Sequence, residues 1–324
     1  MFKRILVPLD RSEVAEKALP VAFRIAQTTG ASVLVLNVLS SGTDYAWTML
    51  QAPMVIGEYV EQEQQDAQEY MQKIEALGQK EQVSLSSLLA RGNAPDTIME
   101  VATEQKCDLI VLCSHGASGL QRWVMGSVAA RVARHSTVPT LILQEKAEQS
   151  IVQRIQAGQQ ISALVALDGG PGAETLLKPA VYLSSLLSSP KPGKVRLIHV
   201  VSQSTLRGRD ESGRHEKQMK EFAKMGAEKY LNEVKQRIEK EVGAQLSCQI
   251  ETVVLSGSDV ASVLLDTAKS CEQAGEGAIL ALATHGRSAL SRWIIGSAAD
   301  RVLSTSQHPL LIYRPEEIQK QPQA

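Results

Sequence analysis

The sequence predicts an α/β protein built from two tandem doubly wound domains, each an open five-stranded parallel sheet with helices on both faces. Three observations lead to this prediction. The chain has 324 residues, more than the roughly 250–300 at which single cores stop growing. One block of sequence occurs twice. In each half, short apolar runs alternate with segments of helical periodicity, which is typical of a parallel sheet with crossover helices.

The repeated block is the clearest feature of the chain. Residues 114–132 read SHGASGLQRWVMGSVAARV, and residues 284–302 read THGRSALSRWIIGSAADRV. Eleven of these nineteen positions are identical without a gap, and two of the three tryptophans, Trp123 and Trp293, fall in register. The register continues through the first and second apolar runs of each half. A single duplication of this length indicates a fused pair of domains, since the repeats of solenoids are shorter.

The elements of the first copy follow from local signals. Ser12 is suited to cap a helix that Gly30 ends, and Pro95 suits a first helical turn. The predicted strands are the apolar runs at 5–9, 33–38, 85–90, 109–113 and 140–143. The predicted helices are 12–30, 58–79, 96–105 and 128–135. The second copy repeats this order from 161 to 313, with a long charged helix at about 216–242.

The repeat also sets the expected domain boundaries. Ile151, Val152 and Ile155 are the apolar residues that could tether an otherwise polar joint by packing. We expect a first domain at 1–146, a linker at 147–160, a second domain at 161–315 and a flexible tail at 316–324.

Composition argues against several classes of function. The formal net charge is -1 and aromatic residues make up 4%, whereas a nucleic-acid binder is expected to be basic with stacking aromatics. No apolar run approaches the roughly 18 residues of a membrane span, so we expect no membrane partner and a cytoplasmic location. The four cysteines have no metal or redox spacing and are expected to be buried, reduced thiols: Cys107, Cys113, Cys248 and Cys271.

The loop after the fourth strand carries the strongest site pattern in both copies. Gly116 and Gly286 follow that strand, and the pairs Gly126-Ser127 and Gly296-Ser297 open the next helix. A glycine lets backbone amides approach a phosphate, and a helix N-terminus offers unpaired amides and the positive end of the dipole. The pattern predicts an anion site. The alternative is that the glycines only turn the chain and the serines only cap helices.

These segments resemble the universal stress protein pattern G-x2-G-x9-G-[S/T], which holds ribose and phosphates in the ATP-binding members of that family. The resemblance covers nearly the whole chain and implies an adenine nucleotide alpha hydrolase-like fold. It extends the nucleotide site to the residues after each Gly-Ser pair, Val128 and Ala298. Both copies depart from the pattern at its first glycine, where Cys113 and Ala283 stand.

The resemblance also assigns roles at the ends of the first and second strands. Asp10 and Asp168 stand where the family's acidic residue contacts the nucleoside, although each could simply begin a turn. Val38 and Val200 end the second strands, where the family offers backbone hydrogen bonds to adenine.

Three side chains of the fourth-strand loops have alternative roles. His115 and His285 could act as general acid or base, or could stabilise their loops. Arg287 follows Gly286 and could bind phosphate or be solvated, and Ala117 fills its place in the first copy.

The sequence contains no P-loop, nucleophile elbow or metal-ligand cluster. The resemblance therefore implies a nucleotide-binding sensor or regulator of the stress response that binds ATP, with Mg²⁺ as an accompanying ion, and at most hydrolyses it weakly. Two alternatives stay open: a scaffold protein without nucleotide affinity, and a carrier of another small ligand in the same cleft. The resemblance further implies an intramolecular pseudo-dimer that places the fifth strands together, and it leaves a further homodimer open.

Overall fold

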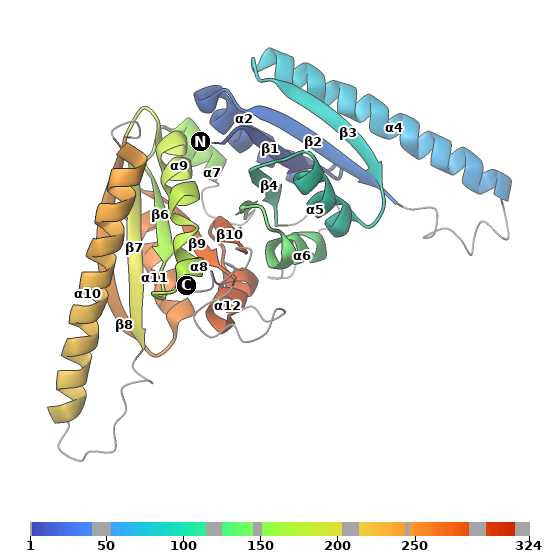
Figure 1. The fold of residues 1–324 in the computed structure, drawn as a ribbon. Helices are drawn as coiled ribbons and strands as arrows, with labels where there is room; N and C mark the ends of the chain where they lie inside the picture. The colour runs from blue at the N-terminus through green and yellow to red at the C-terminus, as the bar shows by residue number, and fades with distance from the viewer. Residues whose placement is uncertain are drawn as a thin grey trace, which may run out of the picture. The chain divides into compact units, whose positions relative to one another are not determined.

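The computed structural model describes residues 2–40, 53–114, 125–144, 151–202, 214–243, 247–284 and 296–314 (Figure 1). The chain divides into two compact units, Met1–Glu145 and Lys146–Ala324. Each unit is an α/β structure with a parallel sheet, and the predicted fold class is confirmed.

The first unit orders its described strands β3-β2-β1-β4-β5, and every pair is parallel. Its elements in chain order are β1 (Arg4–Pro8), α1 (Glu13–Glu16), α2 (Ala18–Thr29), β2 (Ser32–Leu39), α4 (Pro53–Lys80), β3 (Leu85–Arg91), α5 (Ala94–Glu104), β4 (Leu109–Cys113), α6 (Ser127–His135) and β5 (Thr140–Leu143).

The second unit repeats this arrangement with the order β8-β7-β6-β9-β10, again with parallel pairs. Its elements are α7 (Ile151–Gln156), β6 (Ile161–Ala166), α8 (Pro171–Glu174), α9 (Leu177–Ser188), β7 (Gly193–Ser202), α10 (Arg214–Val242), β8 (Cys248–Gly257), α11 (Val260–Gln273), β9 (Gly277–Ala283), α12 (Ser297–Thr305) and β10 (Leu310–Tyr313).

The central strands are buried on both faces. In β1, the consecutive residues Ile5, Leu6 and Val7 are fully buried. Successive side chains of a strand point to opposite faces, so layers of side chains must cover the sheet on both sides. β6 shows the same pattern over 163–165. The edge strand β3 is only partly buried, as expected where one neighbour is missing. The strand ends, where loops begin, are thus held by a rigid core.

The first helix shows two correct predictions and one wrong one. Ser12 caps α1, because its Oγ accepts the Ala15 amide at 3.2 Å. Gly30 ends α2 in a left-handed conformation (φ 74°) and donates its amide to the Ala26 carbonyl at 2.8 Å. The single helix predicted over 12–30 is wrong, because the chain tightens at Lys17, whose amide reaches the Val14 carbonyl at 3.2 Å. Two helices result.

The expected linker contains a short helix, α7, that belongs to the second unit. Ile151 and Arg154 are buried on it. The guanidinium of Arg154 donates to the side chain of Gln159 at 3.1 Å and to the Glu276 carbonyl at 3.3 Å. Hydrogen bonds of a buried cation therefore fix this segment to the second unit, and its apolar packing is only part of the attachment. The helices α4 and α10 begin earlier than predicted, at Pro53 and Arg214.

The expectation of four buried thiols is half right. Cys107 and Cys271 are buried, whereas Cys113 and Cys248 are partly exposed. All four are free. Burial raises the pKa of the Cys107 and Cys248 thiols to about 11, which keeps them protonated at neutral pH. Among the helices described, none is long and apolar enough to cross a membrane.

Candidate functional site

The candidate site of the first unit lies where the strand order reverses. From β1 the chain continues to β2 on one side, passes through β3 and returns to β4 on the other side of β1. Loops leaving β1 and β4 therefore diverge and open a crevice beyond the carboxyl ends of the strands, the usual ligand position in doubly wound sheets.

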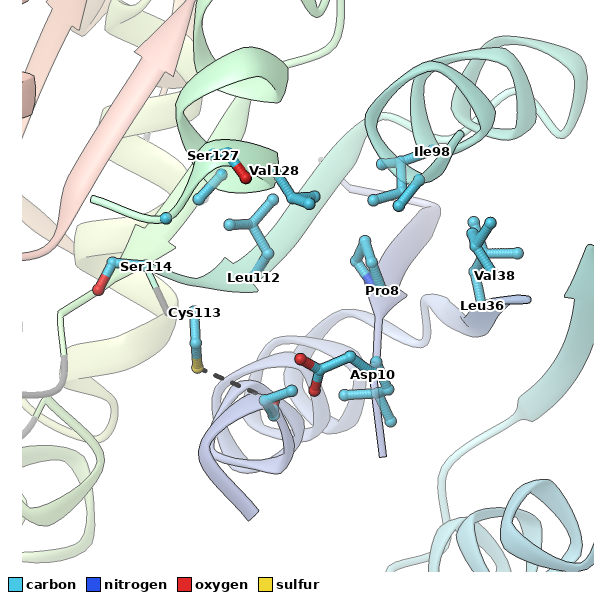
Figure 2. A pocket seen from close by; sticks show the side chains of 15 residues that line it. Pro8, Asp10, Leu36, Val38, Ile98, Leu112, Cys113, Ser114, Ser127 and Val128 are labelled. Carbon is cyan, nitrogen blue, oxygen red and sulfur yellow. Dashed lines mark hydrogen bonds between the residues drawn. The ribbon is translucent and has the colours of Figure 1, made fainter. Parts of the chain in front are cut away.

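A cavity of about 160 Å³ occupies this crevice (Figure 2). It exceeds the roughly 30 Å³ that one water molecule occupies in the liquid, so it has room for part of a larger ligand. Figure 2 shows Leu36, Val38 and Ile98 on one side and Cys113 and Ser114 on the other. The cavity is lined by Pro8, Leu9, Asp10, Ala15, Leu36, Val38, Ala94, Ile98, Leu112, Cys113, Ser114, Gly126, Ser127, Val128 and Ala129.

The lining brings together five of the predicted site residues: Asp10, Val38, Gly126, Ser127 and Val128. They come from three separate segments, the ends of β1 and β2 and the start of α6. The lining combines an apolar wall with a carboxylate, hydroxyl groups and a helix N-terminus. This mixture is typical of small-molecule sites, in which apolar surface supplies burial and a few polar groups fix orientation.

The N-terminus of α6 is the part of the cavity lining whose chemistry suits an anion. Gly126 is the N-cap, and its own amide is used, since it donates to the Ser114 carbonyl at 2.7 Å. Ser127 is the first helical residue, so the alternative in which this serine caps the helix is wrong. The amides of residues 127–129 have no partner within the helix, because the first turn has no preceding carbonyl to bond. They are the donors available to an anion.

The second unit builds the same helix entrance. Gly296 is the N-cap of α12, and its amide donates to the Thr284 carbonyl at 2.9 Å. Ser297 and Ala298 begin the helix, as Ser127 and Val128 do in the first unit. The two copies therefore share this geometry as well as its sequence.

Asp10 both shapes its loop and lines the cavity. Its Oδ1 accepts the Ser12 amide at 3.1 Å and the Ser12 hydroxyl at 2.5 Å, which is the turn predicted as the alternative. Asp168 makes the matching turn by accepting the Gly170 amide at 2.8 Å. The residue that follows each aspartate lies in the left-handed region, with φ 68° at Arg11 and 83° at Gly169. A carboxylate that shapes a turn can still present its other oxygen to a ligand.

A polar side chain of the second strand supports each of these aspartate loops, buried Asn37 in the first unit and half-buried His199 in the second, and sequence reasoning missed both. Asn37 of β2 donates its Nδ2 to the Leu9 carbonyl at 2.7 Å. At the same place in β7, His199 Nδ1 lies 2.8 Å from the Leu167 carbonyl. A carbonyl only accepts, so that ring nitrogen carries the hydrogen. The available signal was a polar residue just before the last valine of each run, LVLNV and RLIHV.

The long helix of each unit carries a tyrosine, Tyr70 on α4 and Tyr230 on α10, that is close enough to the loop aspartate to interact with it electrostatically. The Tyr230 hydroxyl donates to Glu174 at 2.9 Å, and Arg237 also pairs with Glu174. Burial first, and then the neighbouring Glu174, raises the pKa of Tyr230. Burial and Glu16 raise the pKa of Tyr70 in the first unit in the same way. Both phenols stay protonated and neutral at physiological pH.

Cys113 stands at the first glycine of the family pattern and lines the cavity. Its Sγ lies 3.8 Å from the Ala15 carbonyl, so the thiol is directed toward α1 (Figure 2). In the second unit Ala283 occupies this position at the end of β9.

Val38 and Val200 were predicted to end the second strands, and this detail is wrong. β2 continues to Leu39 and β7 to Ser202, since each pairs with its neighbouring edge strand to that point. Val38 nevertheless lines the cavity.

Several predicted site residues lie outside the described part of the chain: His115, Gly116, His285, Gly286 and Arg287. Their roles stay predictions.

Two doubly wound units, each with a parallel sheet and a Gly-Ser pair that opens the helix after its fourth strand, define a tandem α/β protein. The model of the universal stress protein family matches residues 1–144 and 162–314, so the chain belongs to that family.

Curated relatives match one half of the chain at a time. The universal stress protein MJ0531 of Methanocaldococcus jannaschii is 28% identical over 145 residues, which cover 45% of this chain and 84% of the relative. The universal stress protein Sll1388 of Synechocystis is 28% identical over 151 residues, which cover 44% of this chain and 98% of the relative.

Solved structures match the full tandem chain. A universal stress protein from Archaeoglobus fulgidus has a TM-score of 0.60 at 19% identity and covers 97% of this chain and 98% of its own. Protein PA1789 of Pseudomonas aeruginosa, described as functionally unknown, has a TM-score of 0.57 at 16% identity. The match covers 97% of this chain and 93% of its own. At these identities the likeness shows the fold.

Proposed function

We propose that this protein binds an adenine nucleotide, ATP foremost, in the cavity of the first unit and acts as a cytoplasmic sensor or regulator of the stress response. The observation that carries the proposal is the cavity itself, which places an apolar wall beside the first-turn amides of α6 that have no partner within the helix. An aromatic base suits the wall formed by Leu36, Val38 and Ile98. Phosphates suit the amides and the dipole of the helix N-terminus.

Asp10 completes this assignment, because a carboxylate at the cavity lining can accept hydrogen bonds from ribose hydroxyls. Mg²⁺ would be held largely by the phosphates, since it commonly keeps its waters and takes few protein ligands. Among the described residues, no group of three or more His, Cys, Asp or Glu side chains is arranged to hold a metal. The proposal therefore concerns binding, with weak ATP hydrolysis as its upper limit.

The equivalent residues of the second unit form a second proposed site: Asp168, Val200, Gly296, Ser297 and Ala298. Pairing of the two domains as an intramolecular pseudo-dimer stays a prediction from the family resemblance.

The test is calorimetric titration of ATP, with and without Mg²⁺, into protein freed of copurified ligand and into Gly126→Asp. Gly126 has φ -57° and ψ 148°, a conformation open to any residue, and aspartate is a favourable N-cap. The variant should therefore stay folded, within about 0.5 kcal/mol of the parent. Its carboxylate would occupy the amides and repel phosphate, so we expect at least tenfold weaker ATP binding.

Gly126→Asn is the matched control, because it offers a similar cap without the charge. It should weaken ATP binding less than Gly126→Asp does. Gly296→Asp reports in the same way on the second unit. No binding of ATP by the parent protein, or equal affinity in Gly126→Asp, would contradict the proposal. If Gly126→Asp and Gly126→Asn lost ATP affinity equally, the ligand group that contacts the α6 N-terminus would not be an anion.

A further inference from the structure

The two units hold the same loop carbonyl with different side chains. Asn37 of β2 donates to the Leu9 carbonyl, and His199 of β7 donates to the Leu167 carbonyl, in each case just before the loop aspartate. The protonated imidazole and the neutral tautomer with a hydrogen on Nδ1 both make this bond. The loop of the second unit is therefore held at any pH. The difference between the units is a positive charge that histidine can gain and asparagine cannot.

The position of His199 suits a group that exchanges its proton with water. Its side chain is half-buried, whereas Asn37 is only 2% exposed. Imidazole changes its charge between pH 5 and 8, and an amide does not ionise in this range. His199 directly precedes Val200, the counterpart of the cavity-lining Val38, and successive side chains of a strand point to opposite faces. A charge on the ring thus lies on the other face of the strand from the proposed second site.

The ring packs against a hydrogen-bonded cluster between α8 and α10. Tyr230 of α10 lies edge-on to His199, with 6.2 Å between the ring centroids and 73° between the planes. The Tyr230 hydroxyl donates to Glu174 of α8 at 2.9 Å. Arg237 of α10 pairs with the same carboxylate. The cluster thus sets one carboxylate and one guanidinium near the imidazole.

The other elements around His199 add one more charge close to it. Asp168 follows the carbonyl that His199 holds, and it interacts electrostatically with Tyr230. The edge strand β8 places the uncharged Val254 opposite His199. The helix α9 also packs on β7, and its lysine, Lys178, is paired with Glu241 at 3.0 Å. Among the described residues, two carboxylates and one guanidinium therefore surround the ring, a balance that accommodates an added positive charge.

We propose that His199 makes nucleotide binding by the second unit pH-dependent, so that a proton taken up by its ring strengthens the binding of ATP. This pH dependence rests on the proposed nucleotide site of the second unit. Its sign follows from charge, since the phosphates are polyanionic and a nearby positive charge attracts them. By linkage, bound ATP favours the protonated ring to the same extent. We expect ATP binding at pH 6 to be roughly three- to tenfold tighter than at pH 8, because solvent screens the attraction.

Calorimetric titration of ATP at pH 6, 7 and 8 tests this proposal in two variants that each weaken one site. Gly126→Asp reports on the second unit, and Gly296→Asp reports on the first. Affinity should fall more steeply with rising pH in Gly126→Asp than in Gly296→Asp, and the titration of ATP itself is common to both. Adding His199→Asn to Gly126→Asp gives the second unit the side chain that holds the loop in the first. It should reduce the steeper pH dependence to that of Gly296→Asp.

Nuclear magnetic resonance follows the proton on the ring directly. In the Gly126→Asp protein, the His199 signal is the one that disappears in His199→Asn, and saturating ATP should move its titration to higher pH. No ATP binding by Gly126→Asp at any of the three pH values would overturn the proposed second site and this pH dependence with it. ATP binding with the same pH dependence in both site variants, a steeper dependence that survives His199→Asn, or a ring titration unmoved by ATP would overturn the role of His199 alone.

Discussion

At the scale of single residues, Glu276 is a carboxylate that is only 16% exposed and is held by several side chains. Lying just before β9, it accepts hydrogen bonds from Ser162 at 2.6 Å, Arg196 at 2.7 Å and Lys194 at 3.0 Å. Burial alone would raise the pKa of this carboxyl. The hydrogen bonds, that of Arg196 foremost, outweigh burial and hold the pKa at about 2, against an ordinary value of 4.5.

This environment predicts a pH dependence of stability. Because the pKa is lower in the folded state, the stabilisation by Glu276 is complete above pH 4.5 and is lost as the pH falls toward 2. Glu276→Gln should lower the free energy of unfolding near pH 7 by about 1–3 kcal/mol. It should also flatten the fall in stability over the acid range. Urea unfolding followed by circular dichroism across that range measures both effects.

Glu251→Gln is the control for this prediction. Glu251 contacts the same two cations, but its side chain is 45% exposed, against 16% for Glu276. Its replacement should change stability by less than about 1 kcal/mol. Identical acid profiles for Glu276→Gln and the parent would refute the assignment.

Sequence predicted much of the candidate site at this scale. Asp10 and Gly126 could be found because one follows a buried strand and the other precedes a helix, and parallel strands bring such ends together. Val38 was found from the family resemblance. Asn37 could not be found in this way. Its side chain matters through a hydrogen bond to the Leu9 carbonyl, which lies 28 positions away in the sequence. Periodicity contains no information about such a distant backbone partner.

At the scale of elements, α4 approaches β3 unusually closely at Gly78. A Cβ at Gly78 would lie 2.7 Å from the Leu85 Cβ, which is too close for two carbon atoms. Gly57, near the beginning of the same helix, has nothing within 4 Å of its Cβ position. The two glycines thus differ in their surroundings while sharing one helix.

The same substitution at these two glycines should have opposite effects. Gly57→Ala should stabilise the protein by up to about 1 kcal/mol, because alanine favours helix. Gly78→Ala should destabilise it by about 1–3 kcal/mol, since α4 must move away from Leu85. Thermal unfolding of the two variants beside the parent measures the difference. A gain in stability for Gly78→Ala would show that α4 does not pack this closely on β3.

The order of elements was predictable, and one of their interruptions also left a signal in the sequence. Helical periodicity continues across Lys17, but Pro20 lies inside the predicted helix and has no amide to donate to the Glu16 carbonyl. This proline favours a break between α1 and α2. The helix α7 left no such signal, because it is too short for a clear period. Its attachment depends on the buried Arg154, a residue type that is mostly exposed. That attachment arises from tertiary packing, which local propensity does not contain.

At the scale of the whole molecule, duplication has kept the fold and varied the surfaces. Cys113 and Val128 at the first site correspond to Ala283 and Ala298 at the second. The helix α4 exposes Tyr59, while α10 exposes Met219, Phe222 and Met225. One copy can therefore change in ligand or partner preference while the other keeps its own. On this account, the family resemblance predicts the architecture, and the side chains of each copy decide what that copy binds.

Hydrogen–deuterium exchange of the full chain with and without ATP tests whether the first unit binds the nucleotide at the ends of β1, β2 and β4. ATP in the proposed site should slow exchange at the end of β1, the end of β2 and the first turn of α6, around residues 10, 38 and 127–129. Protection around residues 168, 200 and 297–299 would show that the second unit also binds. Protection confined to other segments, or no change in exchange at saturating ATP, would contradict ATP binding in this cavity.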